Sequence, residues 1–238
     1  MTQRTSQLPL SFQAARSYAR ADFVPGDSNE AALALVEAWP HWPQPVCAIW
    51  GPRGSGKTHL AHIWQARSRA RAIEPIALNS EVVAGLATPA IVVIDDADRI
   101  GDGTAFFHLI NFITQSDGSL LLTGGTPPTL WPSSVPDLHS RLTAVSGAAL
   151  QAPDEALIAR VLLKLFADRQ LKLPEALIDY LVPRLGRSFA EAERIVILID
   201  RLALQQKRNI SVDIGAQALR LLEAEQAAGS ADRGEGLV

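Results

Sequence analysis

The chain has 238 residues, of which 47% are hydrophobic and 20% are charged, and its net charge is −3 with an isoelectric point of about 6.0. This composition is typical of a globular protein with one sizeable core, or a core and a small second domain. It argues against a dedicated DNA-binding domain, which normally carries a basic face.

No apolar run reaches the roughly 18 residues that a membrane span needs, so we expect no membrane partner. We expect no signal peptide, because Pro9 and Gln13 interrupt the N-terminal stretch. The single cysteine, Cys47, cannot form an internal disulfide. These features predict a cytoplasmic protein.

The N-terminal region begins with scattered polar residues. Residues 1–22 are predicted to form an extended arm, and from Phe23 a turn leads into a helix with Asp27 or Ser28 as its cap. Residues 39–45 contain three prolines and are therefore predicted to be a loop.

Strands and helices alternate in the next hundred residues. Short apolar runs predict strands at residues 46–50, 73–78, 90–95, 119–124 and near 145–152, with helices at 57–71 and about 103–115. This alternation predicts an α/β class with a parallel sheet covered on both faces.

The pattern changes at Pro153. Four helices are predicted, at residues 154–170, 174–186, 188–206 and 211–226, and no strand signal interrupts them. We therefore divide the chain into an arm (1–22), an α/β domain (23–152), a small all-helical domain (153–226) and a disordered polar tail (227–238).

The segment GPRGSGKT, directly after a predicted strand, matches the phosphate-loop pattern G-x-x-x-x-G-K-[ST]. Its glycines let backbone N–H groups point at phosphate oxygens, and the following helix adds its N-terminal partial charge. The alternative, a plain glycine-rich turn, does not require this strand and helix context. The predicted nucleotide-binding residues here are Gly51, Pro52, Arg53, Gly54, Ser55, Gly56, Lys57, Thr58 and, directly after the loop, His59, which could instead be a packing residue.

The segment AIVVIDDADRI supports the same site. It brings Asp95 to the carboxyl edge of the sheet, where α/β folds bind ligands. Thr58 and Asp95 are the predicted Mg²⁺ ligands, and Asp96 is the candidate for orienting an attacking water. Surface aspartates after a strand are common, so the prediction depends on the phosphate loop. Together the two motifs predict binding of ADP or ATP with Mg²⁺.

Four segments in this order, GPRGSGKTHLAHIW, IVVIDDADRI, LLLTGGTPP and PDLHSRL, resemble the AAA+ module of the bacterial replication initiator DnaA. The resemblance runs from about Phe23 to Glu225 and implies a P-loop AAA+ domain followed by a helical lid. It also implies that the segment beginning at Phe23 borders the adenine. Arg141 matches the arginine finger that acts in trans on a neighbour's γ-phosphate; the alternative role for this residue is a helix-end salt bridge.

The chain departs from the family pattern at two positions. Ala190 stands where the lid usually presents a sensor arginine, with Arg187 and Arg194 about one turn to either side as candidates to replace it. Gly125 stands where the family commonly has an aspartate. These departures imply weak intrinsic hydrolysis and a protein that rests mostly with ADP.

The arm contains the pattern Q-x-x-L-x-F. Gln7, Leu8, Leu10 and Phe12 resemble the peptide that docks in the groove of the DNA polymerase sliding clamp; the alternative is an arm that folds back onto the domain. A DnaA-like module with a short arm, and without a basic helix-turn-helix segment after the lid, resembles the Hda-like regulators.

The resemblance implies that the chain binds the sliding clamp and promotes hydrolysis of ATP bound to the DnaA AAA+ domain. DNA contact is expected to be indirect or weak, and self-association is left open. Three alternatives remain from the residues: a DnaA-like or helicase-loading ATPase, a phosphate-loop kinase, and an adaptor without nucleotide function.

Overall fold

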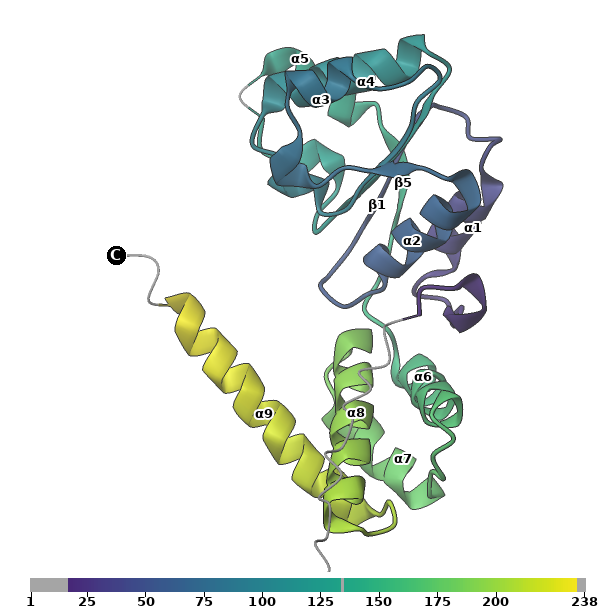
Figure 1. The fold of residues 1–238 in the computed structure, drawn as a ribbon, viewed down its shortest axis with the longest axis vertical. Coiled ribbons are helices and arrows are strands. Elements are labelled where there is room, and N and C mark those ends of the chain that lie inside the picture. The colour runs from purple at the N-terminus through teal and green to yellow at the C-terminus, as the bar shows by residue number, and fades with distance from the viewer. Residues whose placement is uncertain (1–16, 134, 235–238) are drawn as a thin grey trace, which may run out of the picture.

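Five parallel strands form the centre of the N-terminal part of the computed structural model, which describes residues 17–133 and 135–234 (Figure 1). Their order across the sheet is β2-β3-β4-β1-β5, so β1 lies between β4 and β5. The strands are β1 (Val46–Trp50), β2 (Arg71–Ala72), β3 (Ile91–Ile94), β4 (Ser119–Gly124) and β5 (Ser146–Ala149). The predicted α/β class is confirmed.

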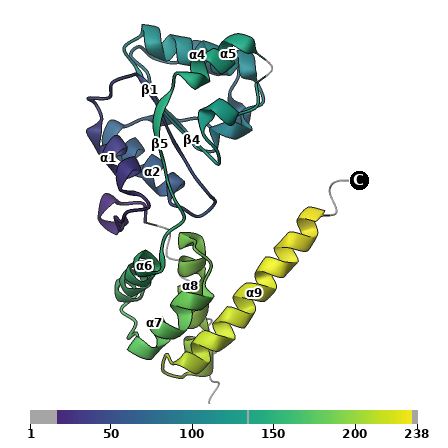
Figure 2. The same ribbon diagram turned by 180° about the vertical axis from the view of Figure 1, so that it is seen from behind.

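Helices cover both faces of this sheet (Figures 1 and 2). One face packs against α1 (Glu30–Ala38) and α2 (Lys57–Ser68), and the other against α3 (Ser80–Ala84), α4 (Gly103–Gln115) and α5 (Pro136–Thr143). Successive side chains of β4 point to opposite faces of the sheet. Leu121 packs into the core beneath α1 and α2, whereas Leu120 and Leu122 pack into the core beneath α3, α4 and α5. Four short 3₁₀ turns complete this part: η1 (Arg20–Asp22), η2 (Pro75–Ala77), η3 (Ala97–Arg99) and η4 (Pro128–Leu130).

The C-terminal part is helical and has its own core. It consists of α6 (Glu155–Asp168), α7 (Glu175–Leu181), the 3₁₀ turn η5 (Val182–Arg184), α8 (Phe189–Gln206) and α9 (Val212–Gly234). Asp154 caps α6 by accepting a hydrogen bond from the backbone N–H of Leu157 at 2.7 Å. Both views show the far end of α9 pointing away from the other helices (Figures 1 and 2).

The second strand was predicted at the wrong place. It is β2, which lies before residues 73–78 and pairs Arg71 with Val92 and Ala72 with Val93. Pro75 has no N–H to donate to a sheet and instead begins the turn η2. Helix α2 correspondingly ends at Ser68 rather than near residue 71, because Arg69 adopts the left-handed conformation with φ of 57°.

Two further boundaries differ from the predictions. Helix α1 begins after Asn29. The Asn29 side chain accepts a hydrogen bond from the N–H of Gly26 and donates one to the carbonyl of Val24, and these two bonds fix the preceding turn. Neither Asp27 nor Ser28 occupies the cap position. Helix α9 continues to Gly234, so residues 227–234 are helical where a disordered tail was predicted; alanine, which is frequent there, favours helix.

Among the described residues, no helix is both long and apolar enough to span a membrane.

The buried thiol of Cys47 provides a test of the sheet core. Cys47 lies on β1 with none of its surface exposed, and burial raises the pKa of the thiol to about 12. Because the thiolate is the reactive species, we expect native protein at pH 7.5 to react with a thiol reagent at least ~100-fold more slowly than protein in guanidinium chloride. Rapid labelling of the native protein would contradict this packing of β1.

Candidate nucleotide-binding site

The predicted phosphate loop connects β1 to α2 and depends on glycine. Gly51, Gly54 and Gly56 have φ values of 156°, 77° and 102°, a range that side chains rarely adopt. A Cβ atom on Gly51 would also lie 2.3 Å from the carbonyl oxygen of Leu150. The backbone therefore curls as an anion-binding loop requires.

Lys57 lies inside this loop. It is 9% exposed, and its Nζ donates to the carbonyl oxygens of Gly51 at 2.8 Å and Pro52 at 2.9 Å. Burial lowers the pKa of its ammonium group, while the carboxylates of Asp96 and Asp95 oppose that shift. The loop thus holds a cation at its centre, which can bind a phosphate group.

Asp95 connects the loop to the sheet edge. Its Oδ2 accepts a hydrogen bond of 2.8 Å from Oγ1 of Thr58, and its Oδ1 accepts one from Oγ1 of Thr123 on β4. A carboxylate and a hydroxyl group are ligands that suit Mg²⁺, so the residues present fit this ion. Thr123 was not predicted, although a polar residue near the end of an otherwise apolar strand was a usable signal.

Asp96 adopts the left-handed conformation with φ of 54°, and its N–H donates to Oγ1 of Thr123 at 2.9 Å. Burial raises the pKa of its carboxyl group, and the neighbouring carboxylates of Asp95 and Asp98 raise it further. An acidic group with a raised pKa at this edge is suited to accept a proton from water or to orient one.

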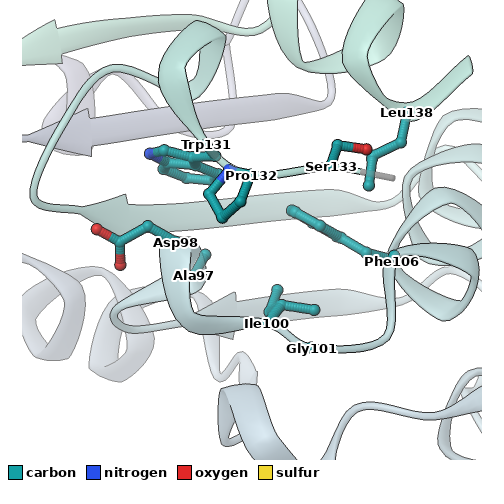
Figure 3. A pocket seen from close by; sticks show the side chains of 10 residues that line it. Ala97, Asp98, Ile100, Gly101, Phe106, Trp131, Pro132, Ser133 and Leu138 are labelled. Carbon is teal, nitrogen blue, oxygen red and sulfur yellow. The ribbon is translucent and has the colours of Figure 1, made fainter. Parts of the chain in front are cut away.

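Asp98 is a site residue that the sequence analysis missed. Its Oδ2 accepts a hydrogen bond of 2.7 Å from the N–H of Gly125. Gly125 is the residue that the sequence analysis singled out as a departure from an aspartate. Asp98 also lines a small pocket, together with Phe106, Trp131 and, from α5, Leu138 (Figure 3). A carboxylate from η3 thus lies next to the loop after β4.

Aromatic rings lie on the other side of the loop. Phe23 is 6% exposed, and its ring contacts His59 edge-on with the ring centres 5.3 Å apart. Rings of Phe23 and Phe189 flank Gly56, from opposite parts of the chain. His59 itself bonds through Nε2 to the carbonyl of Ala19 at 3.1 Å, and burial lowers the pKa of its imidazole. Phe23 therefore lies beside the loop, whereas the His59 side chain bonds to the N-terminal segment.

The helical part contacts the loop through the start of α8. The N–H of Phe189 donates to the carbonyl of Gly54 at 3.0 Å, and a Cβ atom on Gly54 would lie 2.1 Å from Oγ of Ser188. Only glycine permits this approach. The loop is thereby placed between the sheet and the helical part.

Solved structures have the same arrangement of sheet and helices. Domain III of the Thermotoga maritima replication initiation protein DnaA aligns with 85% of this chain and 95% of its own, with a TM-score of 0.71 and 20% identity. The chain therefore has the fold of DnaA domain III. A single-residue variant of Thermotoga maritima RuvB gives a TM-score of 0.68 at 18% identity, covering 87% of this chain and 72% of that one.

A third solved structure and a sequence relative are also similar to this chain. AMPPCP-bound DnaA from Aquifex aeolicus aligns with 79% of this chain and 66% of its own, with a TM-score of 0.65 and 20% identity. An uncharacterized protein of Haemophilus influenzae is 28% identical over 229 residues, which are 90% of this chain and 99% of that protein. No protein-family model matches the chain.

Two of the positions considered for a sensor arginine in the helical part carry no unpaired cation. Ala190 is exposed and carries no charge, and Arg194 makes a two-pronged ion pair with Glu225 of α9, at 2.8 and 2.7 Å. In this structure Arg194 is therefore engaged with α9. Arg187 and Arg53 are exposed and make no hydrogen bond or ion pair with any residue that the structure describes.

Arg141 lies on α5, at the end of the α/β part that faces away from the lid (Figures 1 and 2). Its side chain is exposed, and within residues 17–133 and 135–234 it has no ionic or hydrogen-bonding partner. The structure thus does not bring Arg141 to the chain's own phosphate loop. Gln7, Leu8, Leu10 and Phe12 of the predicted clamp motif lie outside the described residues.

Substitution of Gly54 by alanine tests the contact between loop and lid. The left-handed backbone costs a residue with a side chain about 1–2 kcal/mol, and the new Cβ would also collide with Ser188. We expect Gly54→Ala to weaken binding of a fluorescent ADP analogue at least ~10-fold. Gly101→Ala is the matched control, because nothing lies within 4 Å of a Cβ there. Equal ADP affinity in both variants would contradict the docked arrangement of α8.

Proposed function

We propose that the chain is a DnaA-related regulator that binds ADP or ATP at this site, and that it promotes hydrolysis of ATP bound to a DnaA AAA+ domain while tethered to the sliding clamp. The observation that carries the proposal is the position of Arg141. An exposed arginine without a partner among the described side chains, at the end of an AAA+ fold away from its own loop, suits catalysis in trans.

The residues around the loop suit a nucleotide with Mg²⁺. The curled backbone and Lys57 would hold the phosphates, Thr58 and Asp95 would hold the ion, and Phe23 would border the base. The ion would neutralise phosphate charge. Ala190 and the engaged Arg194 leave the lid without a sensor arginine at these positions, which supports weak intrinsic hydrolysis and a stable ADP-bound form.

The proposed action on the partner is electrostatic. An arginine finger stabilises charge that develops on the transferred phosphoryl group, and such a finger contributes roughly 10³–10⁵-fold to the rate. Arg141 has no ion pair to break before it acts, within the part of the chain that is described. Its guanidinium group is therefore free to enter the site of a neighbouring AAA+ domain.

Replacing Arg141 by alanine tests this role. We expect Arg141→Ala to bind ADP as tightly as wild type and to stimulate ATP hydrolysis by purified DnaA, with DNA-loaded clamp present, at least ~100-fold less. Arg220→Ala is the matched control, because Arg220 is also exposed but lies on α9. Full stimulation by Arg141→Ala would refute the finger.

A second experiment tests the clamp. Because Leu10 and Phe12 are the apolar anchors of the predicted motif and Gln7 orients it, alanine at all three positions should abolish clamp binding in a pull-down. The same variant should lose stimulation of DnaA while retaining ADP affinity. Stimulation that survives the loss of clamp binding would show that tethering is not required.

The adaptor alternative is favoured by one observation: Ala190 carries no charge and Arg194 is paired with Glu225. Under that alternative the site has lost its nucleotide function, the chain only bridges the clamp and its partner, and clamp binding persists without any stimulation of DnaA. The DnaA-like or helicase-loading ATPase predicts instead that the chain hydrolyses ATP alone. The stimulation assay, run with and without DnaA, separates the three possibilities.

A further inference from the structure

Residues 17–23, here called the strap, connect the predicted clamp motif of the arm to the nucleotide site. Every strap residue from Ser17 to Phe23 lies in the described part of the chain, and the strap includes the turn η1. Three groups of contacts connect it to other elements, and they involve both the α/β part and the lid.

The first contacts are with α1 and α2. The Tyr18 ring stacks on His62, with centres 4.2 Å apart and planes at 22°, and the Ala19 carbonyl accepts from His59. Arg20 forms an ion pair with Glu37 of α1. These contacts place the strap along the helix that begins at the phosphate loop.

The second contact is with the lid. Asp22 pairs with Lys164 of α6 at 2.8 Å, and these side chains are only 29% and 26% exposed. The hydroxyl group of Ser17 also donates to Asp22. Lys164 and Ser17 together lower the pKa of the Asp22 carboxyl group, which is therefore charged at neutral pH. A displacement of α6 would stretch this pair.

The strap ends inside the candidate site. Phe23, its last residue, is buried beside His59 and flanks Gly56 of the phosphate loop. The same short segment therefore contacts α2, the lid and the loop. The strap therefore contacts residues on both sides of the nucleotide site.

The arm is attached to the strap by a short connection. Five Cα steps separate Phe12, the last anchor of the predicted clamp motif, from Ser17, and they span at most about 18 Å. A partner that holds Phe12 therefore confines the free end of the strap.

We propose that the strap couples partner binding by the arm to nucleotide binding at the loop, so that each increases the affinity for the other; this inference rests on the proposed function. Its physical basis is ordering. The ion pairs of Arg20 and Asp22 are partly exposed and contribute little individually, so the strap is able to detach, and fixing one end favours the attached state. Thermodynamic linkage then makes the effect reciprocal for ADP and the clamp.

The first measurement uses no clamp. Affinity for a fluorescent ADP analogue is measured for the full chain as wild type, Tyr18→Ala and Asp22→Asn. We expect each variant to bind ADP about 3–10-fold more weakly, within the range of typical coupling effects. Asp213→Asn is the matched control, because the exposed pair of Asp213 with Arg208, at 3.0 Å, lies away from the strap on α9. Equal affinities throughout, with unchanged melting temperatures, would overturn the inference.

The second measurement adds purified sliding clamp at saturating concentration, with binding of the clamp itself checked separately. We expect wild type to bind the ADP analogue at least ~3-fold more tightly with clamp, and Asp22→Asn to lose most of this gain. Clamp binding without any gain in wild type would overturn the coupling and leave the proposed function intact. If the clamp does not bind, the proposed function and coupling to the clamp both fail, and the first measurement alone decides whether the strap supports nucleotide binding.

Discussion

The carboxylate of Asp95 is the interaction on which the candidate site depends. It accepts hydrogen bonds from Thr58 at the start of α2 and from Thr123 on β4, and it directly follows β3. One side chain thus joins the ends of three elements. Because the strands are parallel, their carboxyl ends lie together, and Asp95 fixes the distance between the phosphate loop and this edge.

A second constraint is the contact between loop and lid. The Gly54 carbonyl accepts from the N–H of Phe189, so the lid is joined to the loop by backbone atoms and not by a charged side chain. Arg194 lies one helical turn further along but pairs with Glu225 across the α8–α9 interface. The Arg194 side chain, which the sequence analysis considered as a replacement for the sensor arginine, thus joins two helices of the C-terminal part.

The molecule separates two tasks along its length. The phosphate loop lies between the sheet and the lid, whereas Arg141 lies on α5 at the other end of the α/β part (Figure 1). Between them, the Asp98 carboxylate holds the N–H of Gly125 and lines a pocket whose other wall includes Leu138 of α5 (Figure 3). A chain built this way can hold its own nucleotide while offering an arginine to a neighbour, which is the division that the proposed function requires.

The sequence by itself determined the features that depend on neighbouring residues. The strands at 46–50 and 119–124 occupy the predicted residues, and the phosphate loop curls at the glycines that its pattern requires, because apolar runs and glycine backbones act locally. It did not determine the pairing of Arg194 with Glu225, of Asp98 with Gly125, or of Tyr18 with His62. Each of these joins residues 27 to 44 positions apart. Only tertiary packing decides such contacts, because the distance between two side chains on different elements depends on how those elements are placed by the core.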